Sequence, residues 1–290
     1  MGAVQPARES GRVWDFAGSA EAGPAGAAMI GYRQVDGPGL DLRVAGTAAV
    51  TVLIAFGDGS MTVDDADGPH ALGGFVAGLP LEAMRIRHDR PECVEVRMSP
   101  LRAYALLGVP ASEFGRGVVD LDDLWGHRAE RLREQLAAAG TWGERFDLTR
   151  SFLAQADRPM RAPDPEVIAG WDRIVASRGQ VRIGALATSV GWSNKRLWAR
   201  FESQIGLTPK RAAMLVRFRS AIDGLVAGRP AVEVAVDCGY TDQAHLSRDV
   251  SIFTDRPPGA LMAHYLPDIA RQRHGAWGKF FQDHGGSVGR

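Results

Sequence analysis

An internal repeat near the end of this 290-residue chain constrains its fold more than any other feature. Residues 183–192 match residues 231–240 at an offset of 48 positions, and their apolar positions coincide. In each copy a small residue, Ala187 or Ala235, is followed four positions later by a glycine. A small residue lets two crossing helices approach closely, and glycine adopts the positive φ that a tight turn needs. The repeat therefore predicts two helix-turn-helix units in tandem.

The second helix of the first unit is expected from about Asn194 to Gln204, with Leu197 and Phe201 as its buried seam. At about 100° per residue, that seam turns a cationic face outward. Cations on such a face reach guanine acceptors in a major groove, and small apolar groups meet thymine methyls. The residues predicted to contact DNA in this unit are Ser193, Asn194, Lys195, Arg196, Trp198, Ala199 and Arg200. Two plainer interpretations stay open, a solvated surface for the cations and packing on a neighbouring helix for Trp198.

The second unit has a more polar and less charged outward face. Leu246 and Val250 form its expected seam, and His245 flanks it as a half-buried structural residue. The residues predicted to contact DNA are Gln243, Ala244, Ser247 and Arg248. Residues 221–266 hold three Arg against six acidic residues, a balance of −3, so this unit is expected to bind DNA more weakly.

A helix from Pro209 to about Leu225 joins the two units, with Leu215, Phe218 and Ile222 on its apolar side. One long connector can hold two recognition helices at a fixed separation. Successive major grooves on one face of a duplex are about 34 Å apart, which is the spacing such a connector must serve.

The net charge of zero conceals opposite halves. Residues 1–170 hold 17 Arg and no Lys against 24 acidic residues, giving −7, whereas residues 171–290 carry 17 basic residues against 10, giving +7. Between positions 180 and 220 there are eight basic residues and one acid, Glu202. Such a stretch favours a polyanion, because each cation near a phosphate releases condensed counterions.

The amino-terminal half is predicted to be rich in β-structure. Short strands separated by turn signals are expected at 50–56, 60–63, 74–77, 84–87 and 93–98, a spacing typical of a small sandwich or barrel. Amphipathic helices are expected at 101–107, 120–139, 146–156 and 165–177. The predicted fold is α+β, with a cupin-like β-domain and trailing helices ahead of an all-α domain. Its parts are a loose arm (1–28), the sensing and dimerisation domain (29–157), a linker (158–164), the double helix-turn-helix domain (165–266) and a tail (267–290).

The order of features near the end of the chain is specific. It comprises Gly191-Trp192-Ser193, Leu197, Phe201 and Gly206-Leu207-Thr208-Pro209, then Ala235, Cys238-Gly239-Tyr240, Asp242-Gln243-Ala244-His245-Leu246-Ser247-Arg248 and Pro258. From about Val181 to Leu266 the chain resembles the DNA-binding domain of the AraC family. The resemblance implies a cytoplasmic bacterial transcription regulator that binds double-stranded DNA, forms a homodimer and responds to a small-molecule effector. Val250 and Asp255 depart from the family pattern, which has an aromatic residue and a glycine at these places.

The competing interpretation is a cupin-like enzyme with the helical part as an interaction module. A metal site in such a barrel needs closely spaced histidines with a carboxylate, but His70 and His88 stand apart, as do Cys93 and Cys238. No nucleophile motif or phosphate-binding glycine loop occurs either. We therefore predict no catalytic residue, no metal ligand and no cofactor. No apolar run approaches the roughly 18 residues that span a bilayer, so no membrane partner is expected.

Overall fold

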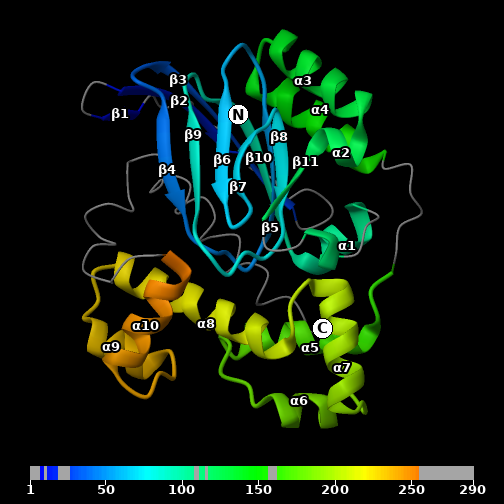
Figure 1. Cartoon of the computed structure of the whole chain (residues 1–290), viewed down its shortest axis with the longest axis vertical. Helices are drawn as coiled ribbons and strands as arrows, with labels where there is room; N and C mark the ends of the chain where they lie inside the picture. The colour runs from blue at the N-terminus through cyan, green and yellow to red at the C-terminus, as the bar shows by residue number, and fades with distance from the viewer. Residues whose placement is uncertain are drawn as a thin grey trace.

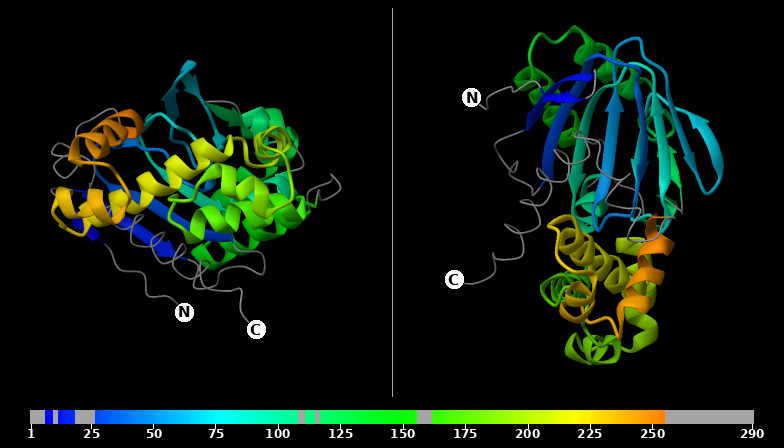
Figure 2. Two further views of the ribbon diagram at one scale, coloured as in Figure 1. Left: turned by 90° about the horizontal axis from the view of Figure 1, so that it is seen from below. Right: turned by 90° about the vertical axis from the view of Figure 1, so that its left-hand side faces the viewer.

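The computed structural model describes residues 7–9, 12–18, 27–107, 111–114, 117–155 and 162–254. An antiparallel β-domain comes first, and a helical part lies at one end of its sheets (Figures 1 and 2). The predicted α+β architecture is confirmed.

Two antiparallel sheets face each other in the β-domain. The larger runs in the order β1 (Ala7–Glu9), β2 (Arg12–Gly18), β3 (Ala27–Asp36), β10 (Glu92–Met98), β5 (Val50–Ala55), β8 (Gly74–Ala77) and β11 (Val118–Asp120). The smaller runs in the order β4 (Leu40–Val44), β9 (Met84–His88), β6 (Met61–Asp65) and β7 (Gly68–Ala71). Strands β5, β6, β8, β9 and β10 fall where the sequence predicts them.

The loose arm expected at residues 1–28 is wrong where that segment is described. Strand β2 pairs with β3, and Trp14 on it is only 1% exposed. The Trp14 ring meets the Tyr32 ring edge to face, with centroids 6.4 Å apart. Burying a tryptophan between two sheets offsets the entropy of ordering a Gly- and Ala-rich segment, and composition alone does not reveal such a contact. The rest of the arm, residues 1–6, 10–11 and 19–26, lies outside the described residues.

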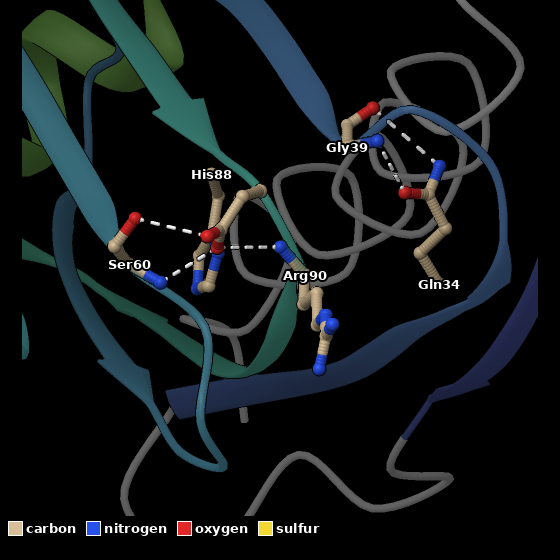
Figure 3. A network of polar contacts seen from close by, with 6 residues as sticks. Gln34, Gly39, Ser60, His88 and Arg90 are labelled. Atoms are coloured by element: carbon tan, nitrogen blue, oxygen red, sulfur yellow. Dashed lines mark hydrogen bonds and ion pairs between the residues drawn. The ribbon is translucent and has the colours of Figure 1, made fainter.

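Hydrogen bonds to a single carboxylate hold the end of strand β9 against the start of β6. Asp89 accepts from the backbone N–H of Ser60 (2.6 Å), from the Ser60 hydroxyl (3.1 Å) and from the backbone N–H of Arg90 (2.8 Å) (Figure 3). These bonds hold the pKa of Asp89 below its usual range. His88 lies beside them in the interior, where burial lowers the pKa of its imidazole.

Helices follow the sheets and cover one of their faces (Figure 1). They are α1 (Pro100–Leu107), η1 (Ala111–Phe114), α2 (Leu121–Trp125), α3 (His127–Ala138) and α4 (Trp142–Ala154). The single helix predicted over 120–139 is wrong, because Gly126 breaks it into α2 and α3 with φ of +52°. Leu121, Leu132 and Leu136 from this region are buried in the chain's own core.

The helical part comprises α5 (Pro165–Ala176), α6 (Ile183–Ser189), α7 (Asn194–Ile205), α8 (Pro209–Val226), α9 (Ala231–Asp237) and α10 (Gln243–Thr254). It shares one apolar cluster with the β-domain, and α7 contacts both α1 and η1. The expected linker falls on residues outside the described part up to position 161, and the expected tail at 267–290 lies wholly outside it.

Candidate nucleic-acid interface

The first helix-turn-helix unit consists of α6, a turn and α7. Gly191 in the turn has φ of +70°, and the Ser193 hydroxyl accepts a hydrogen bond from the backbone N–H of Arg196 (3.3 Å). That bond satisfies one of the free N–H groups at the start of α7. The glycine and the cap thus have the local roles that the repeat predicts.

The buried seam of α7 is confirmed. Leu197 and Phe201 are fully buried, and the Phe201 ring packs against Gly170 of α5. Ile205 and Gln204 extend the buried side toward the end of the helix. Because this side is fixed by packing, the orientation of the remaining α7 side chains is fixed as well.

The seven residues predicted to contact DNA through the first unit are all exposed: Ser193, Asn194, Lys195, Arg196, Trp198, Ala199 and Arg200. Trp198 is 43% exposed, which argues against the interpretation that it packs on a neighbouring helix. The Arg196 guanidinium lies 4.5 Å from the centroid of the Trp192 ring. Stacking on that ring limits the conformations of Arg196 while leaving its cationic edge at the surface.

Arg200 has an intramolecular partner. Its Nε and a terminal nitrogen donate to the two carboxylate oxygens of Asp164, at 2.6 and 2.8 Å. These bonds lower the pKa of Asp164, and its backbone N–H in turn donates to Gln204 (2.9 Å). Asp164 precedes α5, so the pair ties the end of the expected linker to α7. Arg200 must leave this pair before it can contact DNA, unlike Lys195.

The second unit repeats the arrangement with α9 and α10. Gly239 in its turn has φ of +72°, and the Asp242 carboxylate accepts from the backbone N–H of His245 (2.7 Å). Leu246 and Val250 are fully buried, which confirms the predicted seam. The family pattern has an aromatic residue at the position of Val250, and in this chain the aromatic residue of the seam comes later in α10.

Phe253, three residues after Val250, completes this seam. Its ring stacks on Phe218 of α8 with centroids 4.4 Å apart. Phe253 was not predicted from the sequence, although its spacing from Leu246 and Val250 is the helical pattern of i, i+4 and i+7. The second unit is therefore anchored to the connector by an aromatic pair.

The predicted contact residues of the second unit occupy the opposite side. Gln243, Ala244 and Arg248 are exposed, and Ser247 is half-buried. His245 is half-buried too, with its ring 5.1 Å from that of Tyr240 in an edge-on contact, as the sequence predicts.

Acidic residues of the second unit mostly face protein partners. Asp249 is 5% exposed and pairs with Arg217 of α8 at 3.3 Å, so counting it among the surface charges is wrong. Asp237 pairs with Arg229, and Asp242 bonds the backbone at the start of α10. Arg217 also lies over the Tyr240 ring at 4.6 Å. Burial raises the pKa of the Tyr240 hydroxyl. Asp255 lies outside the described residues.

Helix α8 connects the units as predicted, and its residues Leu215, Phe218, Ile222 and Leu225 are buried. It contacts α5 and α7 on one side and α9 and α10 on the other. Figure 1 shows α7 and α10 near opposite ends of this connector. The two outward faces therefore belong to helices that pack on the same connector.

The described part of the chain offers neither a metal centre nor a membrane helix. It holds no cluster of three or more His, Cys, Asp or Glu side chains arranged to bind a metal ion. His70 lies 3.2 Å from Asp65, and His88 lies 3.6 Å from Asp89. No helix in that part has the length and apolar character needed to cross a bilayer.

Comparison with known proteins gives one family match. The family described as "Helix-turn-helix domain" matches residues 186–264, which include both units. No curated protein matches the chain.

Several solved structures resemble the chain at low sequence identity. ToxT from Vibrio cholerae is 10% identical with a TM-score of 0.47, and the match covers 78% of this chain and 97% of ToxT. ToxT with bound unsaturated fatty acid is 12% identical with a TM-score of 0.45, over 78% and 94% of the two chains. The AraC-like transcriptional activator CuxR is 16% identical with a TM-score of 0.34, over 76% and 83%.

Because these TM-scores are low, the identification of the carboxy-terminal domain depends on the family match and on the two helix-turn-helix units described above. Both place the same residues in the same architecture, since the matched segment begins in α6 and extends past α10. The chain carries an AraC-type helix-turn-helix domain at its carboxy-terminal end.

Proposed function

We propose that the chain is a DNA-binding transcription regulator that recognises duplex DNA through α7 and α10. The observation that carries this proposal is the exposed cationic face of α7, where Lys195 and Arg196 stand opposite a fully buried seam. A solvated surface explains isolated charges, but it does not explain why the second helix of a matched helix-turn-helix unit presents them. The contact residues named above are part of this proposal.

The organisation of the whole protein belongs to the same proposal. We expect a cytoplasmic bacterial regulator whose first domain ends near residue 157 and whose DNA-binding domain covers 165–266. A homodimer is expected because two copies engage two sites at once. Leu121, Leu132 and Leu136 of α2 and α3 are buried in the core of the chain, so these three side chains do not form the dimer contact.

The β-domain is proposed to bind a small effector, and the cupin-like enzyme is the less favoured interpretation. ToxT has been solved with bound unsaturated fatty acid. In this chain the case for an effector rests on the shared apolar cluster, which couples the β-domain to α7 and α8.

Selection of binding sites from random DNA tests the function without assuming an operator sequence. The full chain is incubated with a library of random duplexes, and bound molecules are amplified and sequenced over several rounds. The proposal predicts enrichment of a motif with two parts about one helical turn apart. Unchanged library composition, at low and at moderate salt, would contradict it.

A further inference from the structure

A short loop of the first helix-turn-helix unit reaches the second unit directly. The loop, residues 177–180, joins α5 to α6, and α5 in turn packs on α7. Gln180 at the end of this loop donates a hydrogen bond to Asp237, the last residue of α9. Helix α8 is therefore not the only link between the two units.

The backbone of the loop lies on α8. Gly179 is buried, and a Cβ added to it would overlap the Ala213 carbonyl oxygen and lie 2.8 Å from the Arg217 backbone nitrogen. Arg178, just before it, has φ of +51° and is the one non-glycine residue with a positive φ in the described part of the chain. Such a φ is costly for a residue with a side chain and persists where surrounding contacts hold it. The contact with α8 thus fixes the course of the loop.

The Gln180 side chain covers the turn of the second unit. Its Nε2 donates to the Asp237 carbonyl oxygen at 3.0 Å. A Cβ added to Gly239 in the turn would lie 2.8 Å from the Gln180 Oε1 atom and 3.1 Å from its Cγ atom. The glutamine therefore packs flat against the turn glycine in addition to forming its hydrogen bond.

This hydrogen bond completes the end of α9. The last carbonyl groups of a helix have no partner within the helix. Backbone N–H groups that follow α9 bond the carbonyl oxygens of Val234, Ala235 and Val236 within the second unit. The carbonyl oxygen of Asp237 accepts instead from Gln180 of the first unit. One unit thus completes the helix end of the other.

Arg217 of α8 extends the junction to α10. Its backbone lies against Gly179, its guanidinium lies 4.6 Å from the centroid of the Tyr240 ring, and it pairs with Asp249 at 3.3 Å. The loop, the connector and the second unit therefore meet at one place. A shift of the second unit relative to the first would have to break the Gln180 contacts as well as move α8.

We propose that Gln180 is a positioning residue that holds the two units in one relative orientation and thereby sets the spacing between the two parts of the DNA site. The role in spacing rests on the proposed function, whereas the contact between the units does not. One base pair added between the two parts moves them apart by about 3.4 Å and turns them by roughly 35° about the duplex axis. The protein can follow that change only by breaking the Gln180 contacts.

Distances between the units test the positioning role without DNA. Spin labels are attached to the full-length chain at Glu202→Cys on α7 and Ser251→Cys on α10, which replace exposed residues, while the natural cysteines are buried. Pulsed electron paramagnetic resonance should give a narrow distribution of label distances, and Gln180→Ala should broaden it. Gln135→Ala removes an exposed glutamine of α3 and should leave the width unchanged. Equal widths for Gln180→Ala and the labelled parent chain would overturn the proposal.

The spacing of the DNA site tests the consequence of this positioning. A site selected from random duplexes is compared with versions lengthened or shortened by one base pair between its two parts. The natural chain should bind the altered spacings more weakly, and Gln180→Ala should reduce that loss of affinity by about two- to tenfold, which is the contribution of one hydrogen bond. Gln180→Glu keeps the side-chain shape but lacks the donor, so it should reduce the loss as well.

The ratio of affinities for two spacings distinguishes positioning from a merely structural role. If Gln180 only stabilised the fold, Gln180→Ala would lower the melting temperature and leave this ratio as it is in the natural chain and in Gln135→Ala. That result would overturn the proposal, as would equal affinity of the natural chain for all three spacings.

The two measurements separate this inference from the proposed function. Selection without any enriched DNA would remove the proposed function and the role in spacing, while the label distances would still decide the positioning role. Enriched DNA with an unchanged loss of affinity in Gln180→Ala would overturn this inference and leave the proposed function in place.

Discussion

The two helix-turn-helix units share a backbone plan and differ in where their charges point. In the first, Lys195 and Arg196 lie on the surface of α7. In the second, Asp249 and its partner Arg217 are directed into the contact between α10 and α8. The same repeat therefore supplies a cationic face in one unit and a buried ion pair in the other.

This difference teaches that the charge balance of a segment includes residues that do not reach its surface, as Asp249 does not. The balance of −3 over residues 221–266 suggests a unit that repels DNA. Asp237 is engaged with Arg229, Asp242 with the start of α10, and Asp249 with Arg217. Asp249 is therefore lost from the surface of the second unit, whereas Asp237 and Asp242 remain exposed beside Arg248, the cation on the outward face of α10.

The largest expected effect concerns the seams, where the units should behave alike. Phe201→Ala should lower the free energy of unfolding by about 3 to 5 kcal/mol, because it empties a fully buried site. Phe253→Ala in the second unit should have a comparable effect. Chemical denaturation followed by circular dichroism measures both, and near-normal stability of either variant would show that its helix is rotated from the orientation described.

A smaller difference in stability should distinguish the Arg217–Asp249 ion pair from the Arg200–Asp164 ion pair. Asp249→Asn leaves Arg217 partly buried without its partner, which should cost about 1 to 3 kcal/mol. Asp164→Asn makes the same change at the more exposed Arg200 pair and should cost less than about 1 kcal/mol. Thermal melting of the two variants in parallel gives the comparison, and equal losses would mean that burial does not distinguish the pairs.

Base readout should be divided unequally. Substituting base pairs beneath α7 should cost about 1 to 3 kcal/mol each, whereas substitutions one helical turn away, beneath α10, should cost less. The measurement is a scan of single base-pair changes across a footprinted site, repeated with Arg248→Ala. Similar free-energy costs for substitutions beneath α7 and beneath α10 would contradict an unequal division of base readout between the two units.

The smallest effect is a pH dependence of the Arg200 pair. Its bonds hold the pKa of Asp164 below its usual range, so the pair stabilises the fold above the unfolded pKa, about 3.9. The contribution is lost as pH falls through the lower folded-state pKa. The stability difference between the natural chain and Asp164→Asn should therefore be constant from about pH 8 to 5 and disappear in stronger acid. A difference that persists there would assign the effect to something other than the carboxylate.

Local patterns allowed the helix-turn-helix units to be predicted almost completely. The glycine turns, the Ser193 cap and the seams of α7 and α10 follow from residues a few positions apart, which the sequence displays directly. Phe253 was not predicted because the family pattern has the aromatic residue of this seam at the position of Val250, about one turn earlier. The Arg217 to Asp249 pair joins residues 32 positions apart, and no local pattern indicates it.

The β-domain shows the same limit more strongly. Strand β2 and the buried Trp14 depend on pairing with β3. Glu95 and Arg97 alternate with apolar residues in the sequence, as on an exposed strand face, but the second sheet covers them and they form a buried pair. Sheet contacts between distant segments decide which face is inward, and that information is not local.

The salt dependence of DNA binding tests the central claim most directly, because it counts the phosphate contacts that cations make. Lys195→Ala combined with Arg196→Ala should weaken binding and flatten the plot of log K against log salt concentration by about 1 to 2. The matched control, Arg87→Ala with Arg90→Ala, removes the same charge from exposed positions of the β-domain and should leave the slope unchanged. The account predicts a reduced slope for the first pair alone, and a slope equal to that of the natural chain in the Lys195 and Arg196 variant would contradict it.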